Sequence, residues 1–131
     1  MRFENMPMPP SINQCYAQVG RRRIKSAKLV SFNLEMDAWA ILRSSSIRRA
    51  SKSLEGLKLR LDLTFSFPKG KIICKDGSSR KLDVSNRIKA IEDAFCRLLE
   101  IDDSNIFEIR AIKAVGTCEK VALEIGEYVA V

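Results

Sequence analysis

The sequence predicts an α+β fold in which two main helices pack on one small sheet, mostly antiparallel or mixed. Three observations predict it. Residues 57–67 alternate apolar and polar side chains, which is typical of a half-buried strand. Two segments, beginning near Ser26 and Ser85, carry apolar residues at helical spacing, and two more strand-like segments end the chain. Helices and strands in this order favour α+β. We expect one domain over residues 1–131.

The strands are predicted as follows. Leucine and phenylalanine occupy every odd position from 57 to 67, and Pro68 ends the strand. Residues 69–81 hold two glycines and many charged side chains, which predicts a loop with an optional short strand at 72–74. Residues 106–115 and 120–129 are two strands joined by a turn near Gly116, most simply as a hairpin.

The remaining segments are predicted from turn and cap residues. The proline-rich stretch 6–13 is extended or turning, and the basic stretch 20–25 is a candidate hairpin arm. Ser26 is placed to cap a helix that runs to about Arg43. Residues 44–53 are rich in serine and basic, as in a frayed helix end or a mobile linker. The second main helix runs from Ser85 to about Leu99.

The amino-acid composition restricts the partners and the types of catalysis that the protein can have. Lysine and arginine number 23 against 16 acidic residues, so nucleic acid or another anionic surface is the expected partner. No apolar run approaches the ~20 residues of a membrane span, and the first residues do not resemble a signal peptide, so we expect no membrane partner and a cytoplasmic protein. The absence of histidine excludes Ser-His and Cys-His catalysis. Four scattered cysteines predict free thiols and no zinc.

Carboxylates gather around the second helix of this basic chain. They repel polyanions unless a divalent cation lies between, so the combination indicates metal-dependent chemistry on a phosphate backbone. On a helical wheel Ser85, Asn86, Lys89 and Asp93 share a face beside the core face, with Glu92 near them. A purely structural reading is equally open: Ser85 caps the helix, Lys89 and Asp93 form a pair worth ~0.2–0.5 kcal/mol, and Asp102–Asp103 is a turn.

A family resemblance favours metal-dependent chemistry over a purely structural role for these acids. The segment Pro7-Met8-Pro9-Pro10-Ser11-Ile12-Asn13-Gln14-Cys15-Tyr16 resembles the P-x-P-P-S-x-N-x-x-Y motif of the RusA family of Holliday junction resolvases. Gly20-Arg21-Arg22 resembles the basic arm that follows. Asp83-Val84-Ser85-Asn86-Arg87-Ile88-Lys89 resembles D-x-D-N-x-x-K, and Asp102-Asp103-Ser104-Asn105-Ile106 resembles D-D-x-x-V. The motifs occur in the family's order and with about its spacing, over residues 6–125.

The resemblance implies a homodimeric endonuclease of bacteria or phages that uses Mg²⁺ or Mn²⁺. It would resolve four-way DNA junctions by paired, symmetrical nicks, in recombination and repair. By the same resemblance Asp83 and Asp103 bind metal, Lys89 is the catalytic lysine, and Asn86 is its supporting asparagine. Asp102 adjoins Asp103 as a further supporting residue.

One position departs from the motif, because Ser85 stands where the family has its second aspartate. A hydroxyl is a poorer ligand for Mg²⁺ than a carboxylate. Either the site is weakened and the protein only binds junctions or other nucleic acid, or another acid takes over. Glu92 is the candidate, about two helical turns along, and Asp93 is its rival; we favour a working site supported by both.

Phosphate contacts are expected from basic residues on the arm and near the acidic helix: Arg21, Arg22, Arg23, Lys25, Lys75, Arg80, Lys81 and Arg87.

Two other classes of function stay open. One is a binding module without catalysis, in which the acids are caps. The other is a structural dimer within a larger repair or phage assembly.

Overall fold

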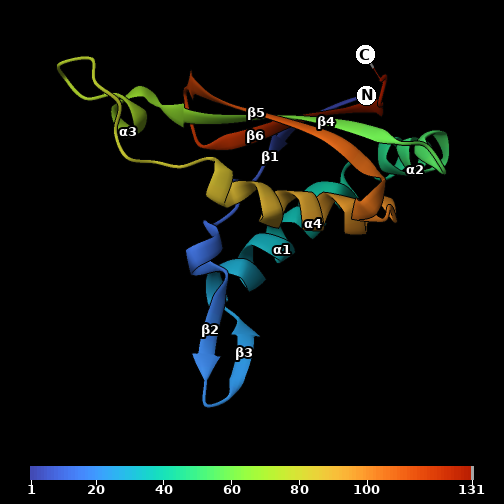
Figure 1. The fold of residues 1–131 in the computed structure, drawn as a ribbon, viewed down its shortest axis with the longest axis horizontal. Coiled ribbons are helices and arrows are strands. Elements are labelled where there is room, and N and C mark those ends of the chain that lie inside the picture. Colours follow the sequence, from blue (N-terminus) through green and yellow to red (C-terminus); the bar gives the residue numbers. More distant parts are fainter. Residues whose placement is uncertain (131) are drawn as a thin grey trace.

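A four-stranded mixed sheet forms one layer of the protein, with helices on one of its faces (Figure 1). The computed structural model describes residues 1–130. The strand order is β1-β6-β4-β5. The bounds of the strands are β1 Arg2–Met6, β4 Leu59–Pro68, β5 Ile106–Gly116 and β6 Lys120–Glu127. The predicted α+β class with a mixed sheet is confirmed.

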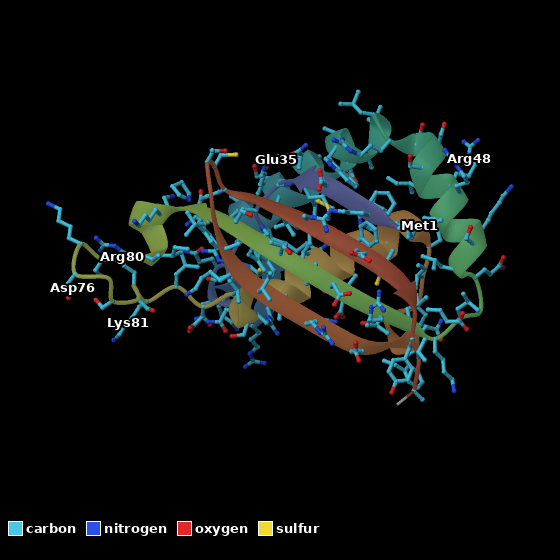
Figure 2. The ribbon with its side chains drawn as sticks, turned by 90° about the horizontal axis from the view of Figure 1, so that it is seen from above. Met1, Glu35, Arg48, Asp76, Arg80 and Lys81 are labelled. Atoms are coloured by element: carbon cyan, nitrogen blue, oxygen red, sulfur yellow. The ribbon has the colours of Figure 1, made fainter. Side chains whose placement is uncertain are left out.

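Strand β4 confirms the alternating pattern. Its odd positions from Leu59 to Phe67 are at most 1% exposed, and the side chains between them are only partly buried. Burying each such apolar side chain is worth roughly 1.5–3 kcal/mol, so this strand fixes which face of the sheet meets the helices. The other face carries no helix (Figure 2).

The predicted hairpin between the last two strands is wrong. β5 and β6 lie on opposite sides of β4, β5 parallel to it and β6 antiparallel. Residues 117–119 cross the end of β4, and a Cβ on Gly116 would lie 3.1 Å from that of Ser66, so glycine suits this crossing. β6 takes the inner position because Val121, Leu123 and Ile125 are all buried, whereas β5 is only partly buried.

Strand β1 was not predicted from the sequence. Its two buried apolar residues, Phe3 and Met6, are three positions apart rather than alternating, because the strand is irregular between them. Phe3 packs edge-on against Trp39 and Phe95. The indole Nε1 of Trp39 donates to the carbonyl of Glu4 at 2.9 Å, which ties β1 to the helix layer.

Three helices make up the second layer: α1 Ala27–Ile41, α2 Ser44–Leu54 and α4 Ile88–Leu99. Ser26 caps α1 as predicted, because its hydroxyl accepts from the Leu29 amide at 3.2 Å. The prediction of a frayed end or linker at residues 44–53 is wrong. Ile47, Ala50 and Leu54 are buried at helical spacing, and this packing overrides the weak helix propensity of the serines.

Two further segments project from the layers. β2 Tyr16–Val19 and β3 Arg22–Lys25 pair as the predicted hairpin arm and point away from the sheet (Figure 1). At the end of β4 the predicted loop begins instead as a short helix, α3 Lys69–Ile72. The optional strand there reduces to one bridge between Ile73 and Ser79. In the described chain, no helix combines the length and apolar character needed to cross a bilayer.

Candidate active site

Helix α4 presents two adjoining faces. Ile91, Phe95 and Leu99 are buried in the core and fix the rotation of the helix. That rotation leaves Lys89, Glu92 and Asp93 on the neighbouring side, as the helical wheel predicted. The predicted helix is confirmed from Ile88 onward, while residues 85–87 form a 3₁₀ turn, η2 Ser85–Arg87.

The turn after α4 brings Asp103 back beside the helix. Glu100 adopts a left-handed conformation with φ of 55°, and the Ile101 amide donates to the carbonyl of Cys96, which ends the helix. The Asp102 carboxylate then accepts from the Ser104 amide at 2.9 Å and caps a second 3₁₀ turn, η3 Asp103–Asn105. The capped turn begins with Asp103 and directly precedes β5.

Lys89 lies at the centre of the resulting cluster. Its Nζ is 2.9 Å from Asp93 Oδ1, 3.1 Å from Asp103 Oδ2 and 3.5 Å from Glu92 Oε1. Carboxylate oxygens of those three acids all lie within 4.8 Å of one another. One ammonium thus faces three carboxylates, and its contacts with Asp93 and then Asp103 raise the pKa of Lys89 well above its ordinary value.

Glu92 is the one buried charged residue between residues 1 and 130, at 8% exposed. Burial raises the pKa of its carboxyl, and the nearby charge of Lys89 only partly opposes that shift. A buried carboxylate destabilises a fold unless a cation compensates it. Its position beside two other acids makes this cluster the candidate functional site.

Cys96 lies close to the same cluster but offers no nucleophile. Burial, followed by the negative charge of Glu92, raises the pKa of its thiol to about 12. The reactive thiolate is therefore scarce at neutral pH. The chemistry of this site rests on carboxylates and one lysine.

The structure brings Asp103 together with Glu92 and Asp93, and Asp83 lies outside this group of three. Asp83 is exposed in the segment before η2. Within η2, Ser85 is exposed and Asn86 half-buried. The pairing of Asp83 with Asp103 as metal ligands thus stays a prediction from the resemblance. Glu92 and Asp93 lie beside Asp103, where acids that replace the missing aspartate would be needed.

The predicted phosphate contacts fall into two exposed groups and one exception. Arg21, Arg22, Arg23 and Lys25 lie on the arm, and Lys75, Arg80 and Lys81 lie on the segment after α3. Figure 2 shows Arg80 and Lys81 on this projecting segment. Arg87 is half-buried and donates to the carbonyl of Pro9 at 2.7 Å. It ties the proline-rich segment to the start of α4.

Arg97 was not singled out from the sequence. It lies one helical turn beyond Asp93, a spacing that was sufficient to place it on the same side of α4. Its guanidinium forms an ion pair with Asp37 of α1 at 3.0 Å, so it joins the two helices next to the acidic cluster.

Three carboxylates gathered on an α+β scaffold of net charge +7 are the arrangement expected of a nuclease that acts through clustered acids. The family model of endodeoxyribonuclease RusA matches residues 7–126. The chain belongs to this family, and the resemblance stated from the motifs is confirmed. At the level of the family it is an endonuclease that resolves Holliday junctions and a hydrolase of phosphodiester bonds. No curated protein matched the chain.

Proposed function

We propose that the chain is a Mg²⁺-dependent resolvase, able to use Mn²⁺, that cuts four-way DNA junctions by paired nicks during recombination and repair. The observation that carries the proposal is the meeting of Glu92, Asp93 and Asp103 around one cation, the ammonium of Lys89. These side chains come from a helix and from the turn that follows it, so the fold itself assembles them.

The donor set fits a divalent ion. Mg²⁺ and Mn²⁺ prefer oxygen ligands, and three carboxylates within 4.8 Å of one another supply them. Glu92, Asp93 and Asp103 would hold the ion, with Asp83 as a further ligand from the adjoining segment. When bound, the ion would activate water for attack and neutralise charge on the scissile phosphate.

Residues of α4 and of the turns on either side of it perform the remaining tasks. Lys89 stabilises the negative charge that develops on the phosphate during cleavage. Asn86 orients the phosphate or a ligand, and Asp102 holds Asp103 in place by capping η3. Glu92 and Asp93 together compensate for Ser85, which stands at the position of a family aspartate.

The substrate contacts follow from the exposed basic residues. The arm and the segment after α3 carry seven arginines and lysines that bind the DNA backbone by charge, leaving the shape of the junction to select the substrate. A homodimer with two-fold symmetry would place one acidic cluster at each of two symmetrical strands. We propose that the protein acts in the cytoplasm and that a bacterium or a phage encodes it.

A synthetic four-way junction with labelled strands tests the function. The wild-type protein should introduce symmetrical nicks in Mg²⁺ and none in EDTA. Asp103→Asn should lower the cleavage rate by roughly 100-fold while the protein stays folded. Glu35→Gln, a change of an exposed acid on α1, is the matched control and should cut normally. Wild-type rates that do not depend on Mg²⁺ or Mn²⁺ would contradict the proposal.

One observation supports a second candidate, a junction-binding protein with little or no catalysis. Ser85 replaces the family aspartate, and a neutral hydroxyl weakens a metal site. This candidate predicts tight junction binding without nicking in either metal. The place of Asp83 in the proposed resolvase has a separate test: unchanged cutting by a folded Asp83→Asn variant would remove Asp83 from the site.

A further inference from the structure

The arm has two chemically different faces. Paired residues of an antiparallel ribbon share a face, so Tyr16, Gln18, Arg23 and Lys25 lie on one side. Ala17 and Val19 lie on the opposite side with their partners Ile24 and Arg22. The first face is polar and aromatic, and the second is mainly apolar. Both are exposed to solvent.

The polar face of the arm borders the acidic helix across a cavity of about 140 Å³. Its apolar lining includes Leu29, Ala90 and Ala94, and Tyr16 and Lys25 line it from the arm. Lys89 and Asp93 also line it, and both belong to the acidic cluster. The cavity therefore lies directly beside the proposed cleavage site.

Tyr16 lies at this cavity, at the base of the arm. The adjoining Cys15 is buried, and its carbonyl accepts from the Ser26 amide at 2.8 Å, which fastens the base of the arm to the start of α1. The Arg23 guanidinium lies 4.0 Å from the centroid of the Tyr16 ring. An exposed tyrosine in this place presents an aromatic ring to a ligand.

We propose that the cavity receives one base of the strand being cut, next to the scissile phosphate, with the base stacked on Tyr16. The inference rests on the proposed function, because the acidic cluster must hold that phosphate. An aromatic ring with an apolar floor suits the face of a base, and every base has such a face. Lys25 is placed to contact the adjoining phosphate. The Asn33 amide, also in the lining, offers both a donor and an acceptor to the edge of the base.

Abasic nucleotides test the proposal. A set of four-way junctions would carry one abasic position each, stepped through the nucleotides around the cut, and cleavage rates would be measured in Mg²⁺. With the wild-type protein, one position should lower the rate by roughly ten-fold or more, the effect of removing one stacked base. Tyr16→Ala should lower the rate on the intact junction similarly, and it should show no further loss at that abasic position.

Two variants serve as controls, and a third is a substitute for the alanine variant. Tyr16→Phe keeps the ring and should retain the wild-type pattern. Val19→Ala changes the opposite face of the same ribbon and should also retain it. Tyr16→Leu removes the ring but keeps apolar bulk, and it replaces the alanine variant if that one unfolds.

Two outcomes would overturn the proposal, and they are distinguishable. If the wild-type protein cuts the junction but the losses from Tyr16→Ala and from every abasic position multiply independently, no base stacks on this ring, and the proposed function stands. If the wild-type protein does not cut the intact junction in Mg²⁺ or Mn²⁺, the proposed function fails and this inference fails with it.

Discussion

Lys89 links three carboxylates that would otherwise repel one another. Its Nζ is within 3.5 Å of Glu92, Asp93 and Asp103, so the lysine neutralises part of their charge in the absence of a metal. A divalent ion bound by the same oxygens would take over that neutralising role. Lysine and ion would therefore compete for the carboxylates, and such competition has measurable consequences.

Replacing Lys89 with methionine should strengthen metal binding while it weakens catalysis. The variant lacks the competing ammonium, so Mn²⁺ should raise its melting temperature more than it raises that of the wild type. Cleavage should fall by roughly 100-fold, because the cation facing the phosphate is removed. Lys28→Met on α1 is the matched control. Equal Mn²⁺-induced shifts in the wild type and Lys89→Met would contradict the competition.

Glu92 should destabilise the metal-free protein when it is ionised. Burial raises the pKa of its carboxyl, so the folded state binds a proton here at higher pH than the unfolded chain does. Stability is therefore lost as the pH rises from the ordinary value of 4.5 through the raised pKa of the folded state. Glu92→Gln removes this loss, and it should be more stable than the wild type at pH 7 and equally stable below about pH 4.

Urea unfolding at both pH values, in EDTA, measures this difference in the free energy of unfolding. The same variant should bind Mn²⁺ at least roughly ten-fold more weakly, since one ligand is removed. Asp76→Asn, at an exposed acid on the segment after α3, supplies the comparison. A Glu92→Gln protein that is less stable at pH 7 would show that the carboxylate stabilises the fold.

At the scale of the element, strong local patterns predicted structure well and long-range pairing did not follow from them. The alternation in β4, the Ser26 cap and the basic arm were all predictable, because each depends on neighbouring residues. The placement of β5 and β6 on opposite sides of β4 depends on a crossing at Gly116 and on which strand buries more apolar surface. The pairing of strands that lie far apart in the chain leaves no pattern among neighbouring residues, so the sequence did not predict it.

The same limit applied to the site. The wheel placed Lys89, Glu92 and Asp93 on one side of α4, because helical spacing is local. The return of Asp103 to that side depends on the left-handed Glu100 and the Asp102 cap, and only the structure shows this turn. Helix α2 was missed because its three buried residues are sparse among serines and arginines.

Helix α2 should prove to be a packed element. Ile47 is 8% exposed, so Ile47→Ala leaves a cavity and should cost about 2–4 kcal/mol of the free energy of unfolding. Ser46→Ala, at an exposed position one residue earlier, should change it by less than about 0.5 kcal/mol. Urea denaturation compares them. An Ile47→Ala protein as stable as the wild type would restore the prediction of a mobile linker.

At the scale of the whole molecule, charge should govern DNA binding. Removing one side chain that binds a phosphate should lower the slope of log K against log salt by roughly 0.9. Replacing Arg22 and Arg23 together with alanine should therefore lower the slope by about 2 on four-way junctions. Arg48→Ala, at the end of the molecule away from Arg80 and Lys81, should leave it unchanged (Figure 2). Equal slopes for the arm variant and the wild type would remove these arginines from the interface.

The proposed metal site is tested most directly by anomalous diffraction from a crystal soaked in Mn²⁺. We predict a peak bounded by carboxylate oxygens of Glu92, Asp93 and Asp103, with the ammonium of Lys89 moved away from its present contacts. The same map would show whether Asp83 joins the site. A Mn²⁺ peak elsewhere, or none, with Lys89 still joined to the three carboxylates, would contradict a metal site at this cluster.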